Sequence, residues 1–259
     1  MITKLYLKKY MNLTILLLIF LGSSVSLFDR YMPGDFFSKK VFAEMKQLTQ
    51  NKKAEFIVIR GFFDEKNSLS VYPLYIVGDT RLEAPAGQGP YTVELQNTTG
   101  SVLSSYSFDS EKLSVIKKDG SEIEIDSRQF AFEIPFNGLA KKLVIKKGSK
   151  VLWNVTRTHK SPVVLIKKPI EGETIKGKVN IEWTGFDADG DTLFYLLESS
   201  TDGGFAWEPL SALFKETNMI LNASTLPASR NIILAVVCTD GFNTTRSKVR
   251  VVTGNTLNP

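Results

Sequence analysis

The sequence is poor in the residue types on which most catalytic and metal sites are built. Its 259 residues include one cysteine, Cys238, and one histidine, His159. A single cysteine excludes an internal disulfide and any zinc site built on several cysteines. A single histidine excludes every constellation that needs two. The sequence also contains no His-Glu-x-x-His, Gly-x-Ser-x-Gly, P-loop or dinucleotide fingerprint, so it argues against most enzyme classes.

The excess of basic residues is small once the N-terminal segment is set aside. The formal net charge is +5, with 32 lysines and arginines against 27 aspartates and glutamates. Lys4, Lys8 and Lys9 lie in the first 26 residues, which contain no acidic residue, so the remainder carries a net charge of +2. The other lysines occur as scattered pairs, not as a cluster interleaved with exposed aromatics. This pattern indicates solvated faces and argues against a partner made of nucleic acid.

Residues 1–26 have the pattern of an export signal. The basic start precedes an uncharged stretch, residues 10–28, whose most apolar part runs from Leu13 to Leu21. Small residues follow, in the order typical of a secretory signal peptide. If the segment is not cleaved, residues 10–28 would anchor the chain in a membrane. Either way the positive-inside rule places the rest of the chain outside, so we expect an extracellular or cell-surface protein. A buried N-terminal helix of a cytoplasmic protein is the alternative.

The next segment, residues 27–53, is a spacer. Phe37, Val41, Met45 and Leu48 recur in it at helical spacing, which predicts a short amphipathic helix. Such a helix could lie on a membrane surface or a partner, or pack on the domain that follows.

Two series of short strands separated by turn residues follow the spacer. The first series defines a domain at residues 54–160, with expected strands at Glu55–Phe62, Ser70–Ile76, Tyr91–Gln96, Val102–Phe108, Glu122–Ile125, Phe130–Ile134, Lys142–Lys146 and Val151–Thr156. The second defines a domain at residues 161–254, with expected strands at Val163–Ile166, Lys178–Trp183, Leu193–Glu198, Trp207–Leu210, Met219–Leu221, Asn231–Thr239 and Lys248–Val252. Residues 255–259 are a tail. The spacing predicts an all-β protein of two tandem Ig-like or fibronectin type III-like β-sandwiches after an N-terminal apolar helix and short spacer.

The second domain resembles a known class of module through an ordered set of motifs. These are Pro169-x-x-Gly172-Glu173, Ile181-Glu182-Trp183-Thr184, Asp187–Tyr195, Ser200–Trp207 and Thr239–Thr244. The series is similar to the fibronectin type III/Ig-like modules at the C-terminal ends of secreted and surface proteins of bacteria and archaea. The resemblance covers residues 85–254, because the first domain looks like the sandwich that often precedes such a module. It implies a fold, but not one function, since such modules serve as stalks, spacers and binding accessories.

Three carboxylates alternate in the segment Asp187-Ala188-Asp189-Gly190-Asp191. Alternating acidic residues begin EF-hand loops, where their oxygens bind Ca²⁺. An EF-hand is excluded here, because Thr192 stands where that loop needs glycine and Leu193–Glu198 is an expected strand.

A Ca²⁺ site of another kind remains a candidate. In a sandwich of this type, the loop with these aspartates and the loop with Asp240 share one pole, beside the incoming linker at residues 157–163. The candidate ligands for a Ca²⁺ that would clamp the two domains are therefore Asp187, Asp189, Asp191 and Asp240. The alternative is a tight turn with solvated carboxylates.

Other side chains have candidate roles in structure or recognition. Ser200-x-Asp202-x-Gly204-x-x-Trp207 matches the Asp-box hairpin, in which the aspartate holds the turn and the tryptophan packs beneath it. Trp153 and Trp183 are expected in cores, as is Cys238. Candidate contacts for a glycan or a protein are the aromatics expected to be exposed in loops: Tyr72, Phe205 and Phe242. Candidate glycosylation sequons begin at Asn97, Asn154, Asn222 and Asn243.

Together these features predict a non-catalytic exported surface protein, acting as a stalk or an adhesion or assembly module. Its expected partners are other surface proteins or glycans, and the one candidate cofactor is Ca²⁺. A carbohydrate-binding accessory module is the first alternative. A subunit of a secreted hydrolase, with a site that no motif marks, is the second.

Overall fold

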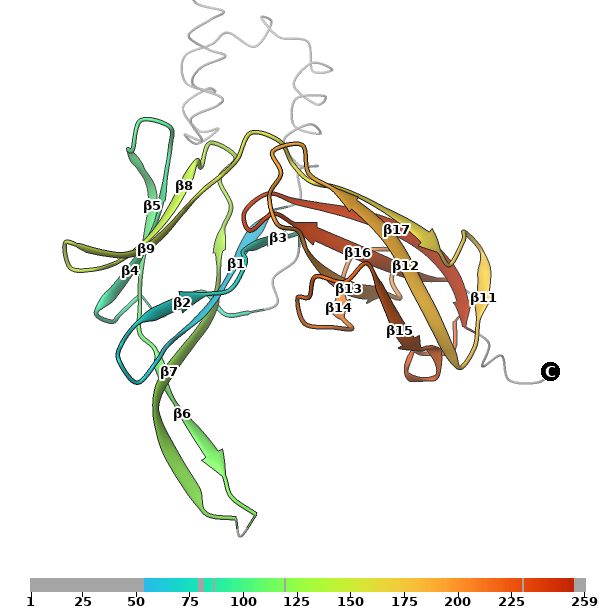
Figure 1. Cartoon of the computed structure of the whole chain (residues 1–259), viewed down its shortest axis with the longest axis horizontal. Helices are drawn as coiled ribbons and strands as arrows, with labels where there is room; N and C mark the ends of the chain where they lie inside the picture. Colours follow the sequence, from blue (N-terminus) through green and yellow to red (C-terminus); the bar gives the residue numbers. More distant parts are fainter. Residues whose placement is uncertain (1–53, 79–81, 86, 119, 230, 254–259) are drawn as a thin grey trace, which may run out of the picture. The chain divides into compact units, whose positions relative to one another are not determined.

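The computed structural model describes residues 54–253, except 79–81, 86, 119 and 230 (Figure 1). The predicted leader at residues 1–26, the spacer at 27–53 and the tail at 255–259 lie outside the described residues. Within the described part, no helix has the length and hydropathy needed to cross a membrane. The described residues all belong to one compact unit.

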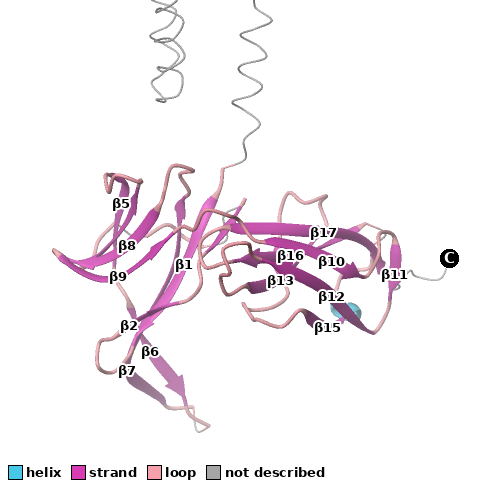
Figure 2. Cartoon of the chain, turned by 45° about the horizontal axis from the view of Figure 1, so that its top comes forward, coloured by secondary structure: helices cyan, strands magenta, loops and turns pink. Residues whose placement is uncertain are grey.

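The described residues are all β apart from a single short 3₁₀ turn, η2, at Ala223–Thr225 (Figure 2). The strands form four sheets, and each series of strands supplies two of them. The prediction of an all-β chain with two Ig-like or fibronectin type III-like sandwiches is therefore confirmed.

The first sandwich comprises β1–β9. Its first sheet has the order β2-β1-β7-β6, with β3 also paired to β1, and contains β1 (Phe56–Phe63), β2 (Leu69–Val71), β3 (Tyr75–Val77), β6 (Glu111–Ile116) and β7 (Glu122–Pro135). Its second sheet has the order β5-β4-β8-β9 and contains β4 (Tyr91–Gln96), β5 (Val102–Phe108), β8 (Lys142–Lys147) and β9 (Lys150–Thr156). Alternate residues of both sheets face one core that is rich in aromatic rings: Phe63, Tyr91, Phe108, Phe130 and Phe132.

A two-stranded ribbon made of β6 and the first part of β7 extends from this sandwich (Figure 1). The two strands expected at Glu122–Ile125 and Phe130–Ile134 are one strand of 14 residues, and β6 was not predicted. Among the described strands β6 pairs only with β7, and Ile116 and Ile123 of the ribbon are exposed. β6 therefore lacks the alternation of buried and exposed positions from which strands are predicted.

The second sandwich comprises β10–β17 and has three strands facing five. The three-stranded sheet has the order β10-β12-β15 and contains β10 (Val163–Lys168), β12 (Lys178–Phe186) and β15 (Asn218–Asn222). The five-stranded sheet has the order β11-β17-β16-β13-β14 and contains β11 (Glu173–Ile175), β13 (Phe194–Ser200), β14 (Glu208–Pro209), β16 (Ile232–Thr239) and β17 (Thr244–Thr253). Trp183 lies in the core against Tyr195 and Phe214. Each of the seven expected strands has its counterpart, and β11, which pairs in parallel with β17, was not predicted.

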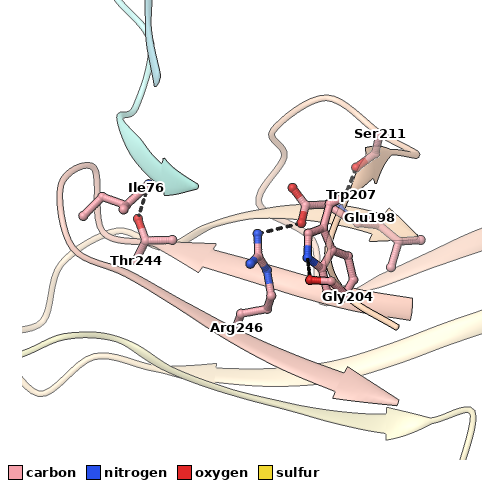
Figure 3. A network of polar contacts seen from close by, with 8 residues as sticks. Ile76, Glu198, Gly204, Trp207, Ser211, Thr244 and Arg246 are labelled. Atoms are coloured by element: carbon pink, nitrogen blue, oxygen red, sulfur yellow. Dashed lines mark hydrogen bonds and ion pairs between the residues drawn. The ribbon is translucent and has the colours of Figure 1, made fainter. Parts of the chain in front are cut away.

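The two sandwiches share buried residues where they meet. Val58, Tyr75 and Val77 of the first form one hydrophobic cluster with Leu196 and Val237 of the second. Backbone groups of β3 and of the loop before it bond to the second sandwich. The N–H of Leu74 donates to the carbonyl of Gly241 at 3.2 Å. The N–H of Ile76 donates to Oγ1 of Thr244 at 2.8 Å (Figure 3), and Oγ1 of Thr239 donates to the carbonyl of Leu74 at 2.5 Å. We call this contact region the junction.

The junction overturns one prediction from the sequence. Phe242 was expected to be an exposed loop aromatic, but it is 2% exposed and belongs to the core of the first sandwich. The reason is the bond between Leu74 and Gly241, which holds the loop between β16 and β17 against the first sandwich. Phe242 is therefore a junction residue and not a surface contact for a glycan.

Candidate functional site at the junction end of the second sandwich

Two loops of the second sandwich lie at its junction end. One, residues 187–193, connects β12 to β13, and the other, residues 240–243, connects β16 to β17. Phe194, at the start of β13, pairs with Thr239, at the end of β16, and Thr239 pairs with Thr244, at the start of β17. Both loops therefore lie at the same end of the sheet.

Three aspartates gather in the first loop. One ligand atom from each of Asp187, Asp189 and Asp191 lies within 4.8 Å of the other two. Oδ1 of Asp187 accepts the N–H groups of Asp189 at 2.8 Å and Asp191 at 3.4 Å. The Oδ2 atoms of Asp187 and Asp191 are buried and have no hydrogen-bond donor within the described residues. The loop therefore concentrates negative charge that its own hydrogen bonds do not fully satisfy.

Asp240 lies at the same end but outside this group. Its Oδ1 accepts the N–H groups of Phe242 at 2.8 Å and Asn243 at 2.7 Å. Its Oδ2 accepts from Oγ1 of Thr158 at 3.1 Å and Nδ2 of Asn243 at 2.7 Å. Both oxygens are thus engaged in holding the loop and the linker, and the candidate ligand set is reduced to the three aspartates of the other loop.

The linker between the sandwiches is bonded to both loops. The N–H of Lys160 donates to Oδ2 of Asp189 at 2.7 Å. Nδ2 of Asn243 donates to the carbonyl of Lys160 at 3.1 Å, and Nε of Arg157 donates to Oδ1 of Asn243 at 2.5 Å. The acidic loop and the linker are therefore one connected structure.

The pKa of the single cysteine, Cys238, is affected by the negative charges at the junction end. Burial, together with the negative charges of Asp240 and Asp187, raises the pKa of the Cys238 thiol to about 12. Cys238 is 0% exposed, so it is the small buried hydrophobe that its strand predicts. The thiol is protonated and unreactive at neutral pH.

The opposite end of the second sandwich carries the Asp-box, and its predicted structural role is confirmed. Asp202 accepts the N–H of Phe205 at 2.9 Å and that of Ala206 at 3.0 Å, and Oγ of Ser200 donates to it at 2.8 Å. The Ala206 N–H and then the Ser200 hydroxyl lower the pKa of the Asp202 carboxyl. Nε1 of Trp207 donates to the carbonyl of Gly204 at 3.1 Å (Figure 3), so the tryptophan closes the turn.

A buried ion pair beside this turn was missed from the sequence. The Arg246 guanidinium lies 2.8 Å from the Glu198 carboxylate, whose side chain is fully buried (Figure 3). Arg246 and Lys248 each lie 4.9 Å from the Trp207 ring. Basic residues at alternate positions of one strand were the available signal, because they share a face. The pair joins β13 to β17 beneath the Asp-box.

One exposed aromatic, Phe186, directly precedes the acidic loop, whereas Phe205 and Tyr72 belong to other segments of the chain. Phe205, at the tip of the Asp-box, is 76% exposed, and Tyr72 is 52% exposed. Phe186 is exposed beside Val163 and Leu165 on the outer face of β10 and β12, and these three side chains form an apolar group that was not predicted. Trp183 and Trp207 are buried as expected, and Trp153 is half-buried against the first core.

The four sequon asparagines differ in accessibility. Asn154 and Asn222 are exposed, and Asn97 is half-buried. Asn243 is 2% exposed, and its Nδ2 atom, to which a glycan would be attached, donates to Lys160, Thr158 and Asp240. The folded chain therefore does not present Asn243 for glycosylation. His159 is exposed in the linker.

No protein-family model and no curated protein matches the sequence. Among solved structures, the chain is similar to the endo-β-1,4-mannanase from Thermotoga petrophila, at 12% identity over 37% of this chain and 20% of that one, with a TM-score of 0.29. It is also similar to the fibronectin(III)-like modules of Clostridium thermocellum CbhA, at 14% identity over 72% of this chain and 87% of that one, with a TM-score of 0.30. The chain thus spans about one fifth of the mannanase. The strand order of the chain itself defines its fold.

Proposed function

We propose that the chain is a non-catalytic exported module that acts at the cell surface or in the secreted space as a stalk or as an adhesion or assembly element. The observation that carries this proposal is the buried junction. Phe242 of the second sandwich completes the core of the first, and a second cluster is built from both.

Interfaces between domains of one chain are more often polar and allow relative motion. At this junction apolar side chains are buried, and the linker bonds to Asp189 and Asn243. A joint of this kind resists bending and lets the two sandwiches unfold together. A rigid joint suits a stalk, which holds other domains at a fixed distance, or an adhesion element, which holds a binding surface in one orientation.

Fractionation of the source cells tests the location. We expect an antibody against residues 54–253 to find the protein in the surface fraction or the culture fluid, accessible to protease on intact cells. A cytoplasmic marker protein, protected in the same cells, is the control. Recovery of the protein with that marker would overturn the proposal.

Carbohydrate binding is a second candidate, and the exposure of Phe205 favours it. The ring is 76% exposed in a turn that Asp202 holds in place, and a pre-ordered aromatic is a suitable platform for a sugar ring. Binding on a glycan array that is lost in Phe205→Ala and kept in Phe186→Ala would support this candidate. Equal binding by both variants, or none by the wild type, would remove it.

A further inference from the structure

Three turns in the described part of the chain share one hydrogen-bond pattern, and they begin at Asp64, Asn97 and Asp187. In each turn, Oδ1 of the first residue accepts the N–H groups two and four positions later. The distances are 2.9 and 2.8 Å for Asp64, 3.0 and 2.9 Å for Asn97, and 2.8 and 3.4 Å for Asp187. In each, the carbonyl of the first residue also accepts an N–H three positions later.

This pattern needs a side-chain oxygen at the first position only. An asparagine supplies it at residue 97, so the turn does not require a negative charge. In the turns at Asp64 and Asn97 the positions two and four later contribute their N–H groups and no carboxylate, and the Thr99 hydroxyl also donates to Oδ1 of Asn97 at 2.8 Å. These positions are Lys66 and Ser68 in one turn and Thr99 and Ser101 in another. Turn formation accounts for the oxygen of Asp187, and the bond from the Lys160 N–H accounts for Oδ2 of Asp189, but neither explains a third carboxylate, that of Asp191, beside them.

Three carboxylates this close together, two of them with a buried oxygen that has no donor in the described part of the chain, are unfavourable unless a cation is present. The three ligand atoms lie within 4.8 Å of one another, and the Asp187 carboxylate is the most buried of the three. Oδ2 of Asp187 and Oδ2 of Asp191 are buried with no donor in the described part of the chain. Burying a carboxylate oxygen without a donor costs free energy, and like charges this close repel one another. A cation would remove both costs at once.

We propose that Asp187, Asp189 and Asp191 bind a Ca²⁺ ion. Oxygen ligands suit a hard cation, and Ca²⁺ binds them at about 2.3–2.6 Å, which places opposite ligands about 5 Å apart. Mg²⁺ binds at about 2.0–2.1 Å, so its ligands can lie no more than about 4.2 Å apart. Ligand atoms that lie within 4.8 Å of one another all fall within the span that Ca²⁺ accommodates, with water completing the coordination.

The ion would act on the junction through Asp189, whose Oδ2 accepts the N–H of Lys160 in the linker. Ca²⁺ would fix the loop to which the linker is bonded. This consequence rests on the proposed function, whereas the binding itself does not. Calorimetry tests the ion and cell fractionation tests the location, so either can fail without the other.

The test is a titration of the full chain with CaCl₂, by calorimetry and by thermal unfolding, after treatment with chelator. We expect one Ca²⁺ per chain and a rise in the unfolding midpoint of about 5–10 °C at about 100 times the dissociation constant. The variant Asp189→Asn/Asp191→Asn keeps the oxygen of Asp187 that forms the turn. It should not bind Ca²⁺, and CaCl₂ should not change its unfolding midpoint. Asp64→Asn changes a turn of the same pattern with no carboxylate cluster, and it should bind as the wild type does.

The unfolding midpoints of the wild type and the double variant in chelator distinguish Ca²⁺ binding from a purely structural role of Asp189 and Asp191. Without Ca²⁺ the double variant should unfold at a higher temperature than the wild type, because it lacks the repulsion between carboxylates. With Ca²⁺ the order should reverse. A wild type that releases no heat and shows no shift would overturn the proposal. A double variant that is shifted as much as the wild type, or is less stable in both conditions, would also overturn it.

Discussion

Two acidic turns stand at opposite ends of the second sandwich, and they use their carboxylates differently. β13 runs from Phe194, after the aspartates at the junction end, to Ser200, before the Asp-box. At the far end, Asp202 accepts N–H groups and a hydroxyl on its oxygens. At the junction end, Oδ2 of Asp187 and Oδ2 of Asp191 are buried without donors among the described residues.

The difference separates a carboxylate that builds a turn from one that is available to a ligand. Hydrogen bonds from Ala206 and Ser200 lower the pKa of Asp202, which is the signature of an anion satisfied by the protein itself. At the junction end the same residue type is repeated beyond what the turn needs. Spacing alone does not distinguish the two turns, whereas the hydrogen-bond partners of each oxygen do.

The largest effect should come from the aromatic residues of the two loops. Phe242→Ala empties part of the first core from the junction end, and we expect a loss of about 3–5 kcal/mol in the free energy of unfolding. Phe205→Ala at the far end changes a side chain that is 76% exposed, and the free energy of unfolding should change by about 0.5 kcal/mol or less. Urea unfolding of both variants measures the difference.

The same experiment tests whether the junction couples the sandwiches. The wild type should unfold in one transition, because the two cores share residues. Phe242→Ala should separate the transition into two, seen as different midpoints for fluorescence and circular dichroism. If Phe242→Ala lowers the free energy of unfolding as little as Phe205→Ala does, the two ends of the second sandwich do not differ as described.

A smaller effect is expected when the turn carboxylate at the far end is removed. Asp202→Ala removes the acceptor of the Phe205 and Ala206 N–H groups, so its thermal midpoint at pH 7 should fall by a few degrees, with or without Ca²⁺. The pKa of Asp202 is lowered in the folded state, so its ionised form stabilises the fold above the unfolded pKa. That contribution is lost as the pH falls through the folded pKa, and the two proteins should then converge. A midpoint difference that persists in acid, or depends on Ca²⁺, would contradict this account.

The sequence predicts strands best where one face is buried and the other is wet. For Tyr91–Gln96 and Val102–Phe108 the first and last residues of the strand were predicted correctly. Along Tyr91–Gln96 buried residues alternate with half-buried ones. β6 was missed because its only partner is the exposed first part of β7, and β11 because it has three residues of which only Ile175 is buried. Strands without an alternating environment leave no period in the sequence.

The site was predictable in composition but not in its contacts. The alternation of Asp187, Asp189 and Asp191 is visible along the chain, and topology places Asp240 at the same end. The burial of Phe242 and Asn243 is not visible, because it depends on Leu74 and on the linker, which are distant in sequence. No local pattern encodes such a contact, so an apolar loop residue next to a sequon resembled a surface feature.

The smallest expected effect uses Cys238 to compare the two ends electrostatically. The pKa of its thiol is raised from 9.0 to about 12 by burial and by the charges of Asp240 and Asp187. The folded state therefore holds this proton more tightly than the unfolded state, so the contribution to stability is fully present below pH 9 and is lost as the pH rises towards about 12. Asp187→Asn should lower this pKa slightly, so the thiolate of Cys238 should form at a lower pH than in the wild type, whereas Asp202→Asn should leave that pH unchanged. Ultraviolet absorbance, which distinguishes a thiolate from a thiol, measures the titration, with Cys238→Ala as the blank. Equal titrations in the two variants would show that the negative charge of the acidic loop does not reach the thiol, and that burial alone holds its proton.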